Sequence, residues 1–267
     1  MKYVLAAMLG LVLWPCMAEA AIKTQVVNYQ QGGIQFQGFL AYDDAISGKR
    51  PAIVVFPEWW GLNDYAKHRA QMLAQLGYVA LAADLFGNGR VTNDPNEAAK
   101  LAGALKADRP LLRQRASAAL EALRMSHLVD PRKLGAIGYC FGGTTAIELA
   151  RSGADVKATV TFHAGLDSPD PTAGRNIKGS ILVCHGGDDA FTKPQDLEAF
   201  EDEMRQNHVG WQMNIYGNAV HSFTNPDADK HGIPGIKYNA LADRRSWEAM
   251  QLFFNDLFGR PNQPAAR

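Results

Sequence analysis

The sequence has no excess charge of one sign, and it is poor in cysteine. Among its 267 residues, 27 lysines and arginines balance 27 aspartates and glutamates, so the formal net charge is zero. A neutral chain gives no reason to expect nucleic acid or an anionic membrane as its main partner. The three cysteines form no C-x-x-C pair and no cysteine–histidine cluster with zinc spacing. No metal or organic cofactor is therefore predicted.

Long hydrophobic runs are also missing, apart from one near the N-terminus. Residues 3–14 are apolar, they follow Lys2, and a small-x-small pattern stands at 18–20. The run is shorter than the ~20 apolar residues that a membrane-spanning helix needs. The pattern is typical of a secretory signal peptide. We therefore expect residues 1–20 to be removed and the mature protein to be secreted, most simply into a bacterial periplasm, with no membrane attachment.

A regular alternation of buried strands and helices fills most of the chain. Continuous apolar runs predict strands that are covered on both faces. They occupy residues 51–58, 78–87, 133–138, 156–165, 179–187 and 211–217. With helices between them, they predict the α/β class, a mostly parallel doubly wound sheet with helices on both faces. An N-terminal hairpin at 23–42 adds antiparallel strands at one edge.

No linker divides the chain between these elements. We expect a single α/β domain over residues 21–260 and a disordered tail at 261–267, a segment rich in proline, asparagine and glutamine. We also expect the protein to be a monomer.

Residues that can carry chemistry stand where the predicted strands end. These residues are Glu58, Cys140, His163, Asp189 and His221. In open α/β sheets the functional groups gather at the carboxyl ends of the strands. The sequence therefore predicts that a thiol, two acids and two histidines share one edge of the sheet.

Residues 138–142 have the form G-x-C-x-G and follow a predicted strand. This is the cysteine version of the strand-turn-helix elbow that presents the serine of α/β-hydrolases. The tight turn forces the nucleophile toward positive φ, and glycines on either side avoid collisions. At the helix N-terminus, the backbone N–H of Phe141 could stabilise an oxyanion. Taken alone, the pattern more often marks a core cysteine at a glycine-rich turn than a nucleophile.

Asp189 and His221 favour the interpretation of Cys140 as a nucleophile. They follow Cys140 in the order nucleophile, acid, histidine that α/β-hydrolases show, each just past a predicted strand. The arrangement predicts a catalytic triad of Cys140, Asp189 and His221. Asp188 is the rival acid, with turn formation as its other possible role.

Five short motifs in this order resemble the dienelactone hydrolase family. They are FPEWWGLN (56–63), AADLFG (82–87), GAIGYCFGG (135–143), HGGDDAF (185–191) and AVHSF (219–223). The resemblance implies a hydrolase of carboxylic esters or lactones that is similar to carboxymethylenebutenolidase. It implies a triad of Cys140, Asp189 and His221, and an oxyanion hole in which the N–H of Trp59 joins that of Phe141.

The resemblance also implies that Glu58 lies near the thiol of Cys140. A carboxylate disfavours a neighbouring thiolate and can accept the S–H hydrogen bond. We therefore expect Glu58 to hold Cys140 as a neutral thiol, a form that resists oxidation better than the thiolate, and to modulate its reactivity.

The chain departs from the family where substrate is bound. The family's arginine soon after the ADL strand is delayed here to Arg90, and Thr224 and Asn225 follow HSF where the second arginine would stand. Arg90 is the candidate for binding a substrate carboxylate. The substrate-pocket candidates are Trp60, Phe86, Arg90, His163 and Phe191.

Two alternatives remain open. The first is a non-catalytic α/β-hydrolase-fold protein that binds a small molecule. The second is a thiol redox protein in which Cys184 would resolve Cys140, although C-x-x-C is absent. The complete triad favours the hydrolase over both.

Overall fold

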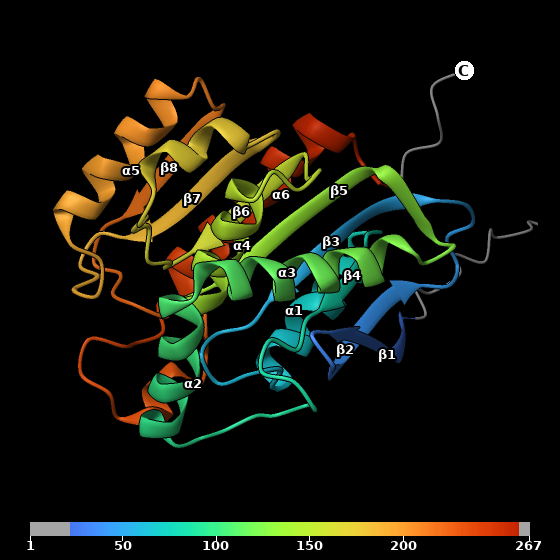
Figure 1. The fold of residues 1–267 in the computed structure, drawn as a ribbon, viewed down its shortest axis with the longest axis horizontal. Coiled ribbons are helices and arrows are strands. Elements are labelled where there is room, and N and C mark those ends of the chain that lie inside the picture. Colours follow the sequence, from blue (N-terminus) through green and yellow to red (C-terminus); the bar gives the residue numbers. More distant parts are fainter. Residues whose placement is uncertain (1–21, 262–267) are drawn as a thin grey trace, which may run out of the picture.

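Eight strands form one sheet in the order β1-β2-β4-β3-β5-β6-β7-β8 (Figure 1). The computed structural model describes residues 22–261, so the signal peptide predicted at 1–20 and the tail beyond 261 lie outside the described residues. β1 pairs antiparallel with β2, and β2 pairs antiparallel with β4, whereas every other neighbouring pair is parallel. The strands are β1 (Ile22–Gln31), β2 (Ile34–Asp43), β3 (Arg50–Phe56), β4 (Val79–Ala82), β5 (Val129–Tyr139), β6 (Ala158–Phe162), β7 (Ser180–Gly186) and β8 (Trp211–Tyr216).

The predicted N-terminal hairpin is confirmed. β1 and β2 meet at Gly32 and Gly33, whose φ angles of 57° and 78° fit the two-residue turn that matches strand twist. The hairpin adds its antiparallel strands to the edge beside β4.

Six helices in the described part of the chain cover the two faces of the sheet. α1 and α6 pack on one face, and α2, α3, α4 and α5 pack on the other, with α3 and α4 in front of the sheet in Figure 1. None of these helices is both long and apolar enough to cross a bilayer. They are α1 (Asp64–Gln75), α2 (Pro95–Ala107), α3 (Arg109–Arg124), α4 (Phe141–Arg151), α5 (Pro194–Gln206) and α6 (Ala240–Phe258), with short 3-10 turns η1 (Pro171–Asn176) and η2 (Ala228–His231).

The central strand β3 shows why its sequence is a continuous apolar run. Ile53 and Val55 belong to the core under α1 and α6, whereas Val54 and Phe56 belong to the core under α3 and α4. Every residue of β3 is buried. A strand with helices on both faces needs apolar side chains at both phases of its two-residue repeat.

β4 is shorter than the strand predicted at 78–87. Its pairing stops because the Asp84 carboxylate accepts hydrogen bonds from the backbone N–H groups of Phe86, Gly87 and Gly89. These bonds turn the chain away from the sheet.

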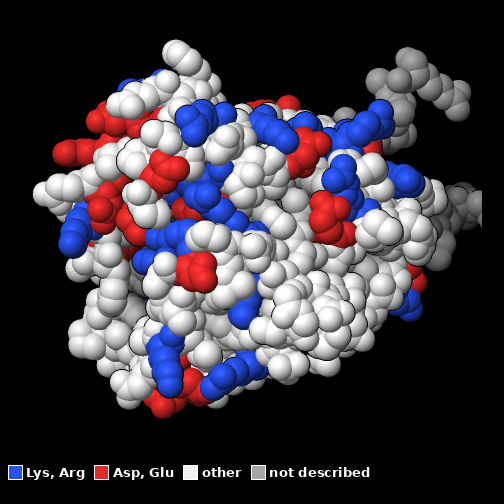
Figure 2. Space-filling model, in the orientation of Figure 1, with Lys and Arg blue, Asp and Glu red and all other residues white. Residues whose placement is uncertain are grey.

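Positive and negative side chains are intermixed on the face seen in Figure 2, without a continuous region of either sign. This distribution agrees with the zero net charge of the chain.

Candidate active site

Cys140 stands at the sharp turn between β5 and α4. Its φ angle of 53° lies in the left-handed region that residues other than glycine rarely adopt. The backbone N–H of Cys140 lies 3.0 Å from the Phe162 carbonyl and 3.1 Å from His163 Nδ1. These two acceptors, both from the end of the neighbouring strand β6, hold the strained residue in place.

The glycines of the G-x-C-x-G motif are required by close backbone contacts. A Cβ atom added at Gly138 would lie 1.9 Å from the carbonyl oxygen of Gly142. One added at Gly142 would lie 2.1 Å from the carbonyl oxygen of Phe56, at the end of β3. Both distances are far below van der Waals contact, so no larger residue fits the turn. The motif is therefore a packing requirement of the elbow.

The structure brings Cys140, Asp189 and His221 into one hydrogen-bonded chain. Cys140 Sγ lies 3.0 Å from His221 Nε2, and His221 Nδ1 lies 2.8 Å from Asp189 Oδ2. The other Asp189 oxygen accepts the backbone N–H of Phe191, which fixes the carboxylate. Asp188, the rival acid, is exposed. Asp189 is therefore the carboxylate that orients the histidine.

His221 is buried between two groups that favour its charged form. Burial alone would lower the pKa of His221, but the Cys140 sulfur and the Asp189 carboxylate outweigh it and raise the pKa to about 10. A protonated imidazole against the sulfur favours a thiolate–imidazolium pair.

Glu58 is buried beside this pair but bonds to other groups. Its Oε1 accepts the Ser222 hydroxyl at 2.8 Å, and its Oε2 accepts the Asn225 amide at 2.7 Å. Burial raises the pKa of Glu58, and these two hydrogen bonds and His221 oppose the rise. The expected hydrogen bond from the thiol to Glu58 is not formed. Among the described residues, the hydrogen-bond partner of Cys140 Sγ is His221.

Trp59 and Phe141 line the same cavity as Cys140. Within residues 22–261, neither of their backbone N–H groups has a hydrogen-bond acceptor. The missing side chain of Gly142 lets the start of α4 approach the carbonyls of Phe56 and Pro57, which lead into Trp59. The two N–H groups are therefore available to a developing oxyanion.

The cavity has a volume of about 290 Å³ and opens above the thiol. Phe191 lines it as predicted, with its ring centroid 4.9 Å from that of His221. α2 contributes a further wall, which no pattern in the sequence predicted, through Ala99, Ala102, Gly103 and Lys106. That wall depends on how α2 packs over the elbow. No group of three or more histidine, cysteine or acidic residues in the described chain is arranged to hold a metal ion.

Three predicted pocket residues lie outside the cavity lining. Arg90 pairs with Glu97 at the surface, so the guanidinium is engaged away from the thiol. Trp60 is buried, with its ring stacked on His231 at 4.1 Å. Phe86 packs against the first turn of α4.

His163 is also not a pocket residue. It is completely buried, and burial holds its pKa well below the usual range, so the ring is neutral. Its Nδ1 accepts the Cys140 N–H, which places the ring proton on Nε2, where it is donated to Thr224 Oγ1 at 2.7 Å. His163 therefore supports the elbow from beneath.

Thr224 and Asn225 hold other residues of the site by hydrogen bonds that the sequence did not reveal. Both are buried and point inward: Thr224 bonds to His163 and to the Tyr65 hydroxyl, and Asn225 bonds to Glu58. Residues that face the core here cannot replace a substrate-binding arginine. Their side chains point inward because of the path of the loop after β8, and no periodicity in the sequence reveals that path.

Cys184, the second thiol of the described chain, has no access to solvent or to the cavity. Cys184 is buried in β7, and burial raises its pKa to about 12. Cys140 and Cys184 are both free. Cys140 is therefore the thiol with access to a ligand.

The model of the dienelactone hydrolase family matches residues 36–258. The chain belongs to the dienelactone hydrolase family. It is similar to the solved structure named m3DLH, with 48% identity and a TM-score of 0.87, covering 89% of this chain and 99% of the other. It also resembles a structure titled a dienelactone hydrolase-like promiscuous phosphotriesterase from metagenomic libraries, with 47% identity, a TM-score of 0.87, and coverage of 90% and 100%.

A curated relative is similar over most of the chain. The "Probable 2-oxo-3-(5-oxofuran-2-ylidene)propanoate lactonase" of a Bradyrhizobium species is 27% identical over 239 residues, 85% of this chain and 93% of its own length. With the family match, these similarities make the protein a dienelactone hydrolase-like hydrolase of the α/β-hydrolase fold, as the sequence resemblance implied.

Proposed function

We propose that this member of the family is a cysteine-dependent hydrolase of a carboxylic ester or lactone. The observation that carries the proposal is the hydrogen-bonded chain from Cys140 through His221 to Asp189, with its sulfur at the cavity floor. A binding protein would have no need for these three groups in this order.

In the first half of the reaction, the Cys140 thiolate attacks the acyl carbon. The N–H groups of Trp59 and Phe141 stabilise the oxyanion of the tetrahedral intermediate. His221, oriented by Asp189, gives its Nε2 proton to the leaving alkoxide as the carbon–oxygen bond breaks. The product is a thioester on Cys140, and with a lactone the alcohol stays attached to the acyl group.

In the second half, His221 takes a proton from water while the water attacks the thioester carbon. The intermediate collapses, the carbon–sulfur bond breaks, and the thiolate returns beside the imidazolium. The acid is released. The steps use the side chains described, the two backbone N–H groups and water.

The acyl intermediate gives a direct test. Brief incubation with p-nitrophenyl acetate at mildly acidic pH should leave one acetyl group per chain, because deacylation needs His221 as a base. Intact-mass and peptide measurements should place it on Cys140, and prior alkylation with iodoacetamide should prevent it. An acetyl group on another residue would contradict the proposal. No turnover of any ester or lactone, with Cys140 still a free thiol, would favour the binding-protein alternative.

A second candidate activity is phosphotriester hydrolysis. It is favoured by the 47% identity, over the whole length of the other chain, to the structure titled a promiscuous phosphotriesterase. The same thiolate would attack phosphorus instead of carbon. Adding an aryl diethyl phosphate to the ester and lactone panel tests this candidate, and phosphoryl transfer to Cys140 is the expected result.

We propose that Glu58 restrains the thiolate by its negative charge. The carboxylate is buried near His221, and its oxygens are held by Ser222 and Asn225, so its charge is poorly screened. This role replaces the direct hydrogen bond expected from the sequence.

Glu58→Gln should therefore speed iodoacetamide labelling of Cys140 several-fold at neutral pH, because the repelling charge is removed while a polar side chain remains. As pH falls through the raised pKa of Glu58, the wild-type carboxyl becomes neutral and the two rates should converge. The exposed residue Glu198 supplies a matched control as Glu198→Gln. Equal labelling rates for wild type and Glu58→Gln across the pH range would refute the role.

We further propose that the hydrolase acts after export. The short apolar run at 3–14 and the small residues at 18 and 20 support this proposal.

A further inference from the structure

The cavity above Cys140 has a cationic end. Lys106, in the last turn of α2, lines it together with Thr144 and Gly165, and its side chain is 41% exposed. Cys140, which immediately precedes α4, and Thr144, in the first turn of that helix, line the same cavity as Lys106. The Lys106 ammonium group is therefore within reach of the far end of an acyl group carried by Cys140.

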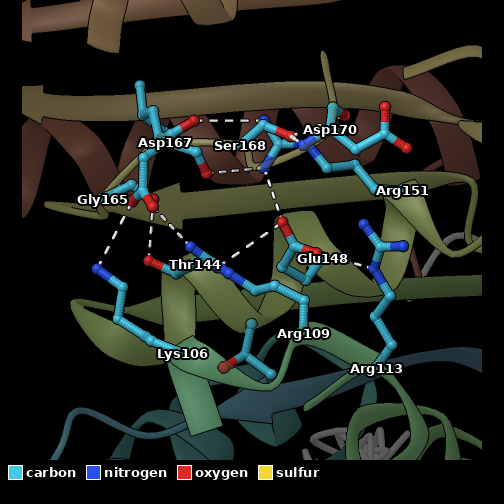
Figure 3. Close-up of polar contacts among 12 residues, drawn as sticks. Lys106, Arg109, Arg113, Thr144, Glu148, Arg151, Gly165, Asp167, Ser168 and Asp170 are labelled. Carbon is cyan, nitrogen blue, oxygen red and sulfur yellow. Dashed lines mark hydrogen bonds and ion pairs between the residues drawn. The ribbon is translucent and has the colours of Figure 1, made fainter. Parts of the chain in front are cut away.

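Lys106 is weakly held where it stands. Its Nζ lies 3.6 Å from Asp167 Oδ1, which is longer than a hydrogen bond. Asp167 is engaged more closely by Arg109, at 2.6 Å. Within the described chain, no acceptor lies in hydrogen-bonding distance of Lys106 Nζ. Figure 3 shows Lys106 and the Thr144 hydroxyl approaching the same loop at Gly165 and Asp167.

Lys106 supplies the one positive charge that its ion-pair cluster has in excess, because the three arginines behind it are balanced by three carboxylates. The cluster has four cations and three carboxylates. The cations are Lys106, Arg109, Arg113 and Arg151, and the carboxylates are Glu148, Asp167 and Glu203. Glu148 is fully buried and is surrounded by the three arginines, so it does not face the cavity. Asp170 lies beyond Ser168 in Figure 3, away from Lys106.

Gly165 keeps this end of the cavity open. A Cβ atom at Gly165 would stand 3.2 Å from Asp167 Oδ1, 3.4 Å from Thr144 Oγ1 and 3.6 Å from Lys106 Nζ, so the Asp167 carboxylate that Arg109 holds also lies at this end. The Thr144 hydroxyl donates to the Gly165 carbonyl at 2.9 Å, so it is already occupied. Lys106 is then the side chain at this end with free N–H donors and a charge to offer.

We propose that Lys106 is a specificity residue that binds an anionic group, a carboxylate or phosphonate, on the acyl portion of the substrate. The proposal rests on the ester or lactone hydrolysis proposed above. The Lys106 site lies on the α2 side of the cavity, whereas Arg90 is engaged by Glu97 outside it. An ammonium ion with mobile donors suits an anion whose position varies with acyl chain length.

Two esters that differ only in charge test the proposal. They are the mono-p-nitrophenyl ester of glutaric acid and its methyl-capped counterpart. In wild type, kcat/KM should be higher for the anionic ester, and the preference should shrink as salt is added. In Lys106→Met the ratio of the two kcat/KM values should fall about five- to tenfold. Lys106→Arg should keep most of the preference, and Lys106→Glu should reverse it.

The control is Lys100→Met, which removes an exposed lysine from the same helix. It should leave the ratio unchanged. Asp167 keeps its bond to Arg109 in Lys106→Met, so no carboxylate is orphaned and the melting temperature should stay near that of wild type. A ratio that is the same in Lys106→Met and wild type would overturn the proposal.

A second measurement needs no turnover. Glutarate should protect Cys140 from iodoacetamide in wild type but not in Lys106→Met, and propylphosphonate in place of glutarate shows which anion is preferred. Protection that is independent of Lys106 would also overturn the proposal. If neither ester is hydrolysed, the proposed hydrolase activity fails, and the protection assay still decides the role of Lys106.

Discussion

Cys140→Ala is expected to lower kcat for ester hydrolysis by about 10⁴-fold or more, because the acyl intermediate can no longer form. Whatever turnover remains would come from the oxyanion N–H groups and from substrate binding, neither of which the substitution removes. The measurement is the steady-state rate on p-nitrophenyl acetate and simple lactones. A circular dichroism spectrum like that of wild type would show that the fold is retained.

The described residues offer a matched control in their second free cysteine. Cys184→Ala removes a thiol that is buried in β7 and has no access to the cavity. It should lower stability modestly through a small core cavity and keep most of the activity. If Cys140→Ala kept wild-type rates, a nucleophile elsewhere would be required. If Cys184→Ala alone lost activity, the assignment of the two thiols would have to be exchanged.

Gly142→Ala should strongly destabilise the elbow. Its Cβ would stand 2.1 Å from the Phe56 carbonyl oxygen and 2.4 Å from that of Pro57. Both contacts are with backbone, at the end of a buried central strand that cannot yield without breaking its pairing. We expect the free energy of unfolding to fall by about 3 kcal/mol or more, and activity to fall with it as the oxyanion N–H groups separate.

Denaturant unfolding measures this loss, and Gly103→Ala supplies the contrast. Gly103 lies within α2, and a Cβ there would meet no atom within 4 Å. Alanine at that helical position should raise stability by about 0.5–1 kcal/mol. Similar unfolding energies for the two variants would mean that the elbow is less tightly packed than the structure shows.

The sequence alone determined the class of fold and the neighbourhood of the thiol. The strands were predictable because β3, β5, β6 and β7 are buried on both faces, which leaves continuous apolar runs in the chain. The convergence of Cys140, Asp189 and His221 followed from the same logic. Groups that follow parallel strands must meet at one edge of the sheet.

The elbow was predictable for a local reason as well. Gly138 and Gly142 lie within four residues of each other, and the clash that demands the first of them involves the second. Because both glycines of this contact lie so close in the chain, the steric requirement can be recognised as a short sequence motif.

Only the tertiary structure decided where the loop side chains point. Arg90, a predicted pocket residue, is paired with Glu97 at the surface. Thr224 lies in the core, where it is hydrogen-bonded to His163. Lys106 gave no signal, because it reaches the cavity through the packing of α2 over the elbow. Loops have no hydrophobic periodicity from which the direction of their side chains can be predicted. The contacts that hold them join residues far apart in the chain. The sequence thus determined which groups meet at the thiol, and the packing of loops and α2 decided which other side chains line the cavity.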